Sequence, residues 1–472
     1  MAVFMRATLL TAAFAAAISP FSRPVHQSGA SGKSYYAAPA GSRAGNGTKA
    51  RPWDLATGLA APLQPGDTLW LRGGVYRGTF RSTLSGRQSA PVVVRQYPGE
   101  RAIIDSHGSR GNALAVKGDY STFWGFELTN SDPARATALL GTELRPDVVV
   151  NDASHTKYIN LIVHDGGVGF YNEPASLDVE VAGCVFYNNG WQGPDRGHGH
   201  GLYLKSLAGP LVVRDNVVFN QFGYGIHAYT NAGTGKLINI HITGNVSFDN
   251  GALAAKPSSA PNILLGGADY ASGDEVSGNF TYFPPSAPTS DVNVRIGFGK
   301  TRNGDVQVTD NYFAGGDPVL EFGFWAAARI ANNMLLARGA GSMIRRVDPM
   351  TSASQIWREN HESAPPAESK IVVRPNPYEA GRAIVIVYNW AHADTVTADL
   401  SAVLGRGDDY EIRSVQDLFG APLTTGTYNG GAVRVPMNRI TPPTPVGMPR
   451  SPAPTTGPEF DVFLVARALP KP

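Results

Sequence analysis

Short apolar stretches, each interrupted once by asparagine or glycine, recur through the middle of the chain. They read YINLIVHDGG (158–167), VEVAGCVFYNNG (179–190), LVVRDNVVFNQFG (211–223), INIHITGNVSFDNG (238–251), VQVTDNYFAGG (306–316) and ARIANNMLLARG (328–339). β-Branched residues alternate with polar ones in these stretches, which is the pattern of strands that bury one face. No helical periodicity separates them, so the pattern predicts a succession of short strands.

An asparagine marks the same place in five successive coils. Asn216, Asn245, Asn279, Asn311 and Asn333 follow one another at spacings of 29, 34, 32 and 22 residues. Repeats of this length without helices indicate a β-solenoid. Because asparagine tolerates left-handed backbone and can bond to its equivalent in the next coil, we expect it at a corner.

A second repeat aligns three strands without gaps. HGHGLYLKS (198–206) matches FGYGIHAYT (222–230), and VGFYNE (168–173) fits the same frame. The alignment stacks Phe170 over Leu202 and predicts neighbouring strands about 4.8 Å apart. With the even-numbered aliphatic residues inward, two outward columns result: Tyr171, Tyr203 and His227 in one, and Glu173, Lys205 and Tyr229 in the other.

The N-terminal part carries a more specific signature. YYAAPAGSRAGNGTKARPW (35–53) is followed by LQPGDTLWLRGGVYRGTF (63–80) and PVVVRQYPGERAIID (91–105). This segment resembles the opening of right-handed parallel β-helix proteins of the pectate-lyase superfamily. The resemblance implies an all-β fold: a right-handed parallel β-helix over 34–360 whose open end is capped by a short helix, here residues 53–61.

Residues 370–472 are expected to form a separate unit. HESAPPAESK (361–370) has the proline and glutamate content of a linker. Beyond it, AIVIVYNW, TVTADLS, YEIRSVQ, VRVPM and FDVFLVAR have the spacing of sandwich strands, with a proline-rich loop at 440–458. We expect a small antiparallel β-sandwich, which resembles the C-terminal accessory domains of carbohydrate-active enzymes.

Residues 1–30 have the layout of an export signal. Arg6 precedes an apolar run from Ala7 to Ile18 that is too short to span a bilayer. A net charge of +2 with 17% charged residues gives no reason to expect binding to nucleic acid or membrane. Cys184 is the only cysteine, so no intramolecular disulfide can form. We expect a secreted or periplasmic monomer that is stabilised by its core alone.

Lys205 is the candidate catalytic base. HGLYLK (200–205) resembles the DGF-x-x-K coil of a β-helix lyase family whose lysine takes the proton from C5 of a uronate. The resemblance implies the same role for Lys205. Where that family carries calcium-binding aspartates, this chain has His200, Tyr224 and His227, so calcium remains a candidate cofactor without an assigned ligand.

β-Elimination on a uronate-containing polysaccharide needs a cation for the carboxylate, a base for the C5 proton and an acid for the leaving oxygen. The candidate catalytic residues are Arg295 or His200 as the cation, Lys205 as the base, and Tyr229 or His227 as the acid. The candidate substrate-binding residues are Tyr171, Tyr203, Tyr224, Glu173, His164 and His198.

His198 and His200 can both point outward only if a corner interrupts the alternation of the strand before Leu202. Strict alternation would turn both imidazoles inward with Leu202, which is costly. A glycine-permitted corner at Gly199 or Gly201 would expose them.

Three alternatives stay open. Lys205 and Glu173 could form a simple surface salt bridge. Inverting glycoside hydrolysis on the same fold needs two carboxyl groups with room for water between them, and the nearby acids are Asp165, Glu173 and Asp195. A non-catalytic glycan-binding β-helix is the third, and a test for unsaturated uronate products separates these classes.

Overall fold

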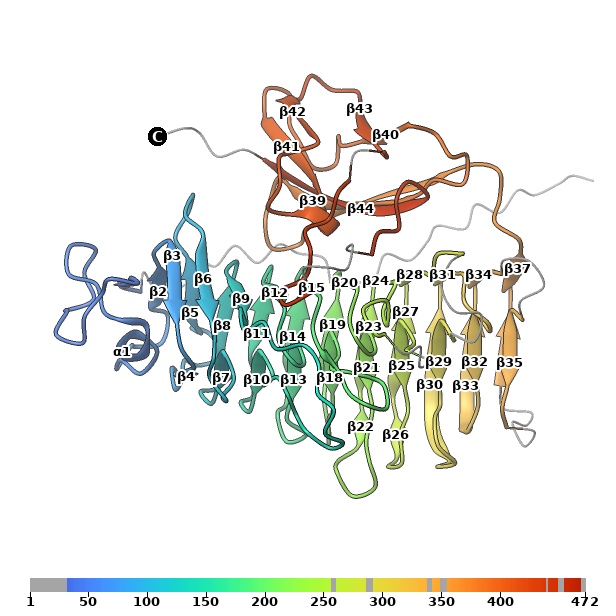
Figure 1. The fold of residues 1–472 in the computed structure, drawn as a ribbon, viewed down its shortest axis with the longest axis horizontal. Helices are drawn as coiled ribbons and strands as arrows, with labels where there is room; N and C mark the ends of the chain where they lie inside the picture. Colours follow the sequence, from blue (N-terminus) through green and yellow to red (C-terminus); the bar gives the residue numbers. More distant parts are fainter. Residues whose placement is uncertain are drawn as a thin grey trace, which may run out of the picture.

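The computed structural model describes residues 32–255, 260–285, 292–337, 342–348, 355–438, 440–448 and 454–467. These residues form three long sheets in which every strand pair is parallel, stacked coil upon coil into an elongated β-helix (Figure 1). The predicted export signal at 1–30 lies outside the described residues. The described part contains no helix with the length and apolar character that a membrane crossing requires.

Each coil contributes one strand to each of the three sheets. The twelve-stranded sheet consists of β1 (Ser34–Ala37), β2 (Thr68–Leu71), β5 (Val92–Gln96), β8 (Ser121–Trp124), β11 (Lys157–Ile159), β14 (Val179–Ala182), β19 (Leu211–Arg214), β23 (Ile240–Thr243), β27 (Asp274–Ser277), β30 (Asn303–Thr309), β33 (Trp325–Ala331) and β36 (Gln355–Arg358). The ten-stranded sheet consists of β4 (Phe80–Ser82), β7 (Leu114–Val116), β10 (Val149–Asn151), β13 (Phe170–Asn172), β18 (Leu202–Leu204), β21 (Ile226–Ala228), β25 (Ile263–Leu265), β29 (Val294–Ile296), β32 (Leu320–Phe322) and β35 (Ile344–Arg346). The eleven-stranded sheet consists of β3 (Gly74–Arg77), β6 (Ala102–Asp105), β9 (Glu127–Thr129), β12 (Ile162–His164), β15 (Val185–Tyr187), β20 (Val217–Phe219), β24 (Val246–Phe248), β28 (Phe280–Tyr282), β31 (Tyr312–Ala314), β34 (Met334–Leu336) and β37 (His361–Ser363).

Short strand pairs extend two of the turns. They are the antiparallel β16 (Trp191–Gln192) and β17 (Gly197–His198), and the parallel β22 (Leu237–Ile238) and β26 (Ala271–Ser272). The first pair forms part of a loop beside the candidate site.

A ladder of buried asparagines joins the coils at the turn between the twelve-stranded and eleven-stranded sheets. The side chain of Asn279 donates to Asn311 Oδ1 (3.0 Å) and accepts from Asn245 Nδ2 (3.1 Å). The backbone N–H of each asparagine also donates to the side-chain oxygen of the next one. The predicted ladder is therefore confirmed, and it continues from Asn216 to Asn360.

The left-handed residue at this turn is not the ladder asparagine. The residue just before it takes the positive φ, as at Asp215 (56°), Gly244 (67°) and Asp310 (59°). The expectation that the ladder asparagine itself adopts left-handed backbone was therefore wrong. Its side chain instead turns inward, where the neighbouring backbone groups need partners.

The single α-helix of the described residues, α1 (Leu55–Leu59), lies at the N-terminal end of the β-helix (Figure 1). Its first turn is capped by Asp54, whose carboxylate accepts from Thr57 N at 2.8 Å. Leu55 and Leu59 are buried in the same core as the first strands. The helix is shorter than the predicted 53–61 because Trp53 instead forms a parallel bridge with Ala37.

The C-terminal segment forms two antiparallel sheets. The five-stranded sheet consists of β38 (Lys370–Pro375), β39 (Arg382–Tyr388), β44 (Phe460–Arg467), β41 (Asp409–Ser414) and β42 (Thr424–Thr427), and the two-stranded sheet of β40 (Thr395–Asp399) and β43 (Ala432–Pro436). A 3-10 turn, η1 (Val415–Asp417), follows β41. The predicted linker at 361–370 is partly wrong, since its first residues form β37, the last strand of the eleven-stranded sheet.

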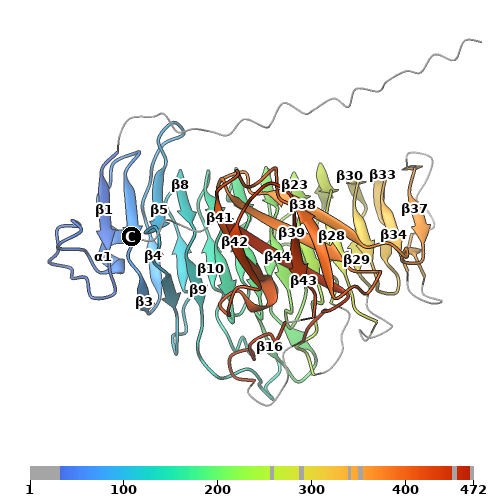
Figure 2. The same cartoon turned by 90° about the horizontal axis from the view of Figure 1, so that it is seen from above.

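The C-terminal sheets lie over the middle of the β-helix and pack against the eleven-stranded sheet (Figure 2). The aromatic ring of Phe460 stacks on Tyr282 at 4.6 Å between centroids, and Tyr388 packs on Tyr312 at the same separation. Trp390 Nε1 donates to Tyr312 Oη at 3.1 Å. The C-terminal segment therefore makes its apolar contacts with the eleven-stranded sheet, and not with the outer side of the ten-stranded sheet.

We expect Asn279→Ala to lower the free energy of unfolding by about 3 kcal/mol, because each buried polar group left without a partner costs about 1–3 kcal/mol. The substitution removes bonds to Asn245, Asn311 and the carbonyl of Ile242. Urea denaturation measures the loss. Asn438→Ala, which removes an exposed bond to Asp394, is the control and should cost much less. Equal effects of the two substitutions would show that the ladder does not stabilise the fold.

Candidate functional site

The three aligned strands stack in the predicted register. Phe170 pairs with Leu202, and Leu202 pairs with Ile226, so these side chains point into the core. Tyr171, Tyr203 and His227 follow them in one outward row. The register predicted from the sequence is confirmed for β13, β18 and β21.

The rings of the outward row pack on one another and on two neighbouring tyrosines. We call this set of five rings the ring pile: Tyr171, Tyr203, Tyr224, His227 and Tyr229. The ring centroids of Tyr171 and Tyr203 are 5.4 Å apart, and those of Tyr203 and His227 are 5.1 Å apart in a stacked arrangement. Tyr224 and Tyr229 also stack on His227, with ring centroids 4.2 Å and 4.9 Å away. The ring pile offers a flat apolar surface of the kind that packs against sugar rings.

Lys205 lies against this pile. Its side chain is largely buried, and Nζ is 5.1 Å from the Tyr203 ring centroid and 5.6 Å from that of Tyr171. Burial lowers the pKa of the Lys205 amine, although Glu173 and Asp269 act in the opposite direction. Among the described residues, no ion pair joins Lys205 to Glu173, so the simple salt bridge considered above does not form.

His200 lies in the same cluster, 4.4 Å from His227 between ring centroids. Gly199, with a φ of 86°, supplies the corner that turns the imidazole toward the outward row. The backbone N–H of Tyr224 donates to His200 Nδ1 at 3.2 Å, which leaves the proton of a neutral ring on Nε2. Burial and the charge of Arg196 lower the pKa of His200 to about 3.

His227 is the second neutral imidazole of the cluster. Burial, followed by the nearby His200, Arg196 and Lys205, lowers its pKa well below the ordinary value. Its Nδ1 is buried and has no hydrogen-bond partner in the described part of the chain.

Tyr229 is half-buried at the end of the outward column. Its hydroxyl donates to Asn231 Oδ1 at 3.2 Å. The hydroxyl therefore has a polar partner while the ring stays stacked on His227.

His198 belongs to the neighbouring loop. Its Nε2 bonds to Asp195 Oδ1 at 2.8 Å, and its ring stacks on Trp191 with centroids 5.4 Å apart. Asp195 therefore already has a basic partner, which weakens it as a candidate hydrolytic acid.

Arg295 points outward as predicted, but two strands beyond His227 in the outward row. Its Nε lies 2.6 Å from Glu321 Oε1, and Arg345 donates to the other oxygen of Glu321. Its guanidinium stands over Phe298, which in turn packs on Tyr229. Arg295 therefore already has a carboxylate partner, which it shares with Arg345.

Asp147 is a site residue that the sequence analysis missed. It lies two residues before Val149, just as His200 lies two before Leu202 in the same sheet. Its Oδ1 accepts from Val168 N at 3.0 Å. Burial and the neighbouring Glu143 raise the pKa of Asp147 to about 7, and its charge contributes to the raised pKa values of Tyr171 and Tyr203. The only signal in the sequence was an aspartate two residues before β10, the strand that pairs with β13.

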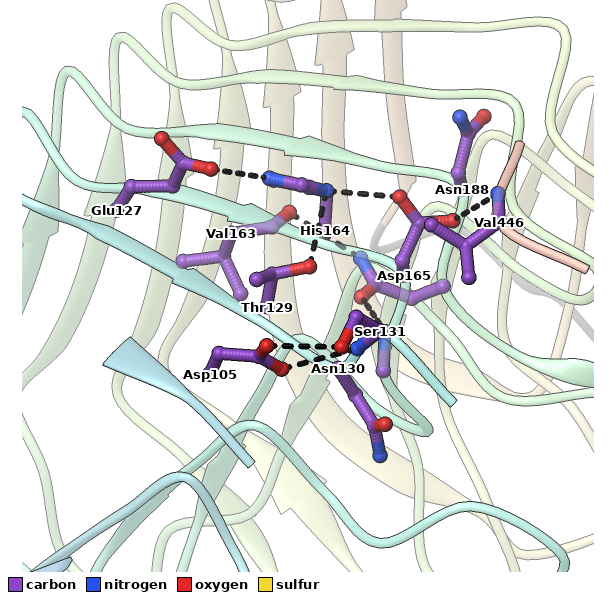
Figure 3. A network of polar contacts seen from close by, with 12 residues as sticks. Asp105, Glu127, Thr129, Asn130, Ser131, Val163, His164, Asp165, Asn188 and Val446 are labelled. Carbon is purple, nitrogen blue, oxygen red and sulfur yellow. Dashed lines mark hydrogen bonds and ion pairs between the residues drawn. The ribbon is translucent and has the colours of Figure 1, made fainter. Parts of the chain in front are cut away.

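His164 lies on a different sheet from Lys205. It ends β12 of the eleven-stranded sheet, so it does not share a cleft with the ten-stranded sheet as was expected. Its two ring nitrogens bridge Glu127 Oε1 (3.1 Å) and Asp165 Oδ2 (2.8 Å), as Figure 3 shows. Asp165 is further bound by Arg135 at 2.9 Å.

This second network connects to the C-terminal segment. Val446 N donates to Asp165 Oδ1 at 3.2 Å (Figure 3). The ring centroid of Phe419 is 6.4 Å from that of His164. Hydrogen bonds to the two carboxylates raise the pKa of His164 to about 9 against the opposing effect of burial. The network is an internal ion cluster, and Asp165 is not available beside Lys205 for hydrolysis.

The candidate site has a poor donor set for calcium. Calcium prefers carboxylate and carbonyl oxygens, whereas His200, Tyr224 and His227 supply two imidazoles and a phenol that are packed on one another. Across the described residues, no group of three or more His, Cys, Asp or Glu side chains is arranged to hold a metal ion. The residues present do not fit calcium.

The fold is that of a parallel β-helix, and comparison with known sequences agrees. Residues 35–169 match the family model described as Pel9A-like, right-handed β-helix region. The sequence-based resemblance to right-handed parallel β-helix proteins of the pectate-lyase superfamily is thereby confirmed.

Two characterised relatives are similar over part of the chain. Pectate lyase L of Thermoclostridium stercorarium is 24% identical over 233 residues, which cover 47% of this chain and 18% of that protein. Pectate lyase PEL9 of Emericella nidulans is 33% identical over 135 residues, which cover 26% of this chain and 28% of that protein. The chain therefore matches less than a third of the length of either relative.

Solved structures to which this chain is similar include a lacto-N-biosidase of Eubacterium ramulus and the pectate lyase Pel9A. The first has a TM-score of 0.47 at 15% identity and covers 71% of this chain and 68% of its own. The second has a TM-score of 0.43 at 18% identity and covers 71% and 80%.

We expect His164→Gln to lower the free energy of unfolding by about 3 kcal/mol at pH 7, because removing one member of a buried ion cluster leaves the others uncompensated. The folded-state pKa of His164 is raised, so its contribution is complete below about pH 6.5 and is lost as the pH rises through about 9. Denaturation between pH 6 and 10 should therefore show a steeper alkaline decline for the native protein than for the variant.

His241→Gln provides the matched control, since His241 pairs with Glu275 on the surface at 3.1 Å. Such exposed pairs contribute about 0–1 kcal/mol. If both variants lose the same stability and show the same pH profile, the His164 network is not a buried ion cluster.

Proposed function

We propose that this protein is a polysaccharide lyase that cleaves a uronate-containing polysaccharide by β-elimination. The observation that carries the proposal is Lys205: a largely buried amine with a lowered pKa, packed against two tyrosine rings and not paired with Glu173. Burial favours the neutral form of such an amine, and a neutral amine can accept a proton. The names of the two relatives, both pectate lyases, favour the same chemistry.

In the proposed reaction, the Lys205 amine takes the proton from C5 of the uronate. The electron pair of that C–H bond forms the C4–C5 double bond as the bond from C4 to the leaving oxygen breaks. A proton from the Tyr229 hydroxyl completes the leaving group, and the tyrosinate then recovers a proton from solvent. Tyr203 and Tyr171 hold the sugar ring by stacking.

The two histidines act as neutral groups in this mechanism. His200 has a pKa of about 3, so it cannot supply the positive charge that the sequence analysis assigned to it. With Nδ1 accepting from Tyr224, its Nε2–H is a hydrogen-bond donor. We assign it to the carbonyl oxygen on which charge develops.

We further propose that α1 caps the open end of the β-helix and that the C-terminal sheets form a β-sandwich accessory domain. Export to the periplasm or the medium, and a monomeric state without nucleic-acid or membrane partners, are part of the same proposal. A polysaccharide is the expected substrate.

An inverting glycoside hydrolase is the second candidate, and one observation favours it. Asp147 and Glu173 are two carboxyl groups beside the ring pile, both with raised pKa values. A carboxyl group that stays protonated near pH 7 suits a general acid. Glu173 is one of the three acids expected from the sequence, and in this reaction Asp147 would take the place of the other two, Asp165 and Asp195.

We expect Lys205→Ala to reduce kcat by about 10²–10⁴-fold, the range for losing a general base. Lys205→Arg should not restore activity, because arginine remains protonated. The assay follows the ultraviolet absorbance of unsaturated uronate products on a panel of acidic and neutral polysaccharides. Lys236→Ala, on the exposed surface, is the control and should leave the rate unchanged.

The pH profile gives an independent measure. Activity should rise with pH through a pKa below that of an ordinary lysine, since burial lowers the pKa of Lys205. New reducing ends without ultraviolet absorbance would instead support the hydrolase. Near-normal turnover of Lys205→Ala would overturn the proposed base.

A further inference from the structure

We propose that the cluster around Lys205 accepts uronate residues whose carboxyl group is esterified, in preference to the free carboxylate. This inference rests on the proposed β-elimination and names the substrate class for it. It comes from the distribution of charge around the ring pile and from a donor set that does not fit calcium.

The negative charge that develops when the C5 proton is removed depends on whether the carboxyl group is free or esterified. Removing the C5 proton next to a free carboxylate builds a second negative charge on the same group, which needs concentrated positive charge nearby. Removing it next to an ester builds only one negative charge, which hydrogen-bond donors can stabilise. The C5 proton is also more acidic next to an ester than next to a carboxylate.

The cations near the cluster already have roles or partners within the protein. Lys205 must be neutral to act as the base. The other two have carboxylate partners: Arg295 with Glu321 at 2.6 Å, and Arg196 with Asp195 at 3.6 Å. A substrate carboxylate would therefore have to compete with Glu321 for Arg295 and with Asp195 for Arg196.

The groups that face the ring pile are neutral donors instead. His200 offers Nε2–H because its Nδ1 accepts from the Tyr224 N–H. His227, stacked against Tyr224 and Tyr229, is also an uncharged ring. Neutral N–H donors and stacked rings suit an ester carbonyl and its alkyl group better than a hydrated anion.

The pKa values of two carboxyl groups of the protein indicate that this surface destabilises a negative charge. Asp147 and Glu173 both have raised pKa values, chiefly because of burial and then because of nearby acids. A substrate carboxylate at the same place would meet the same desolvation and the same like charges. An ester avoids both costs.

The test compares two forms of one polymer with the full-length protein: a highly methyl-esterified polygalacturonate, and the same preparation after saponification. Unsaturated products are followed by ultraviolet absorbance, with and without a calcium chelator. We expect kcat/KM to be at least about 10-fold higher on the esterified polymer, and the chelator to have no effect.

A faster reaction on the saponified polymer, or a rate that depends on added calcium, would overturn this inference and leave the lyase proposal intact. No absorbance change with either polymer would overturn both. Binding gives a readout independent of turnover. The Lys205→Ala variant lacks the proposed base and adds no charge, and in affinity electrophoresis it should be retarded more by the esterified polymer; stronger retardation by the saponified polymer would count against the inference.

Discussion

A buried amide must find partners, and in this protein each buried asparagine of the ladder finds them in the coil above and the coil below. The side chain of Asn279 is fully enclosed, and so are its neighbours Asn245 and Asn311. An axial slip of one coil relative to the next would leave several buried donors and acceptors unpaired at once. The ladder therefore fixes how the coils align, and that alignment puts Tyr171, Tyr203 and His227 in one row.

The two-residue period of the strands was enough to predict the fold and much of the candidate site. Once Leu202 and Ile226 are known to point inward, the outward positions of Tyr203 and His227 follow from the geometry of a pleated strand. The strand period does not show which side chains from different coils contact one another. Asp147 was missed because its coil returns through a long loop of unrelated sequence. The ion pair between Arg295 and Glu321 was missed because no repeat in the sequence aligned β32 with its neighbours.

Two histidine clusters in the same fold have opposite charge states, and their surroundings explain why. His164 is held between two carboxylates, which stabilise the imidazolium more than burial destabilises it. His200 and His227 are buried beside tyrosine rings and each other, with basic groups nearby, so burial prevails and both rings are neutral. Sequence alone does not distinguish these cases, because the deciding neighbours come from other coils. The charged cluster joins the C-terminal segment to the β-helix, whereas the neutral cluster lies on the open surface of the ten-stranded sheet.

The unequal spacing of the ladder asparagines has a consequence for how such a molecule can diversify. Coil lengths differ, with 34 residues from Asn245 to Asn279 and 22 from Asn311 to Asn333, yet the turn at the ladder keeps the same hydrogen bonds throughout. Length variation is therefore confined to the other turns, including the one that carries β16 and β17 beside the ring pile. Insertions there would reshape the walls of the binding surface without disturbing the stack. Evolution, or an engineer exchanging loops between relatives, could alter the shape of the accepted polymer while leaving the scaffold unchanged.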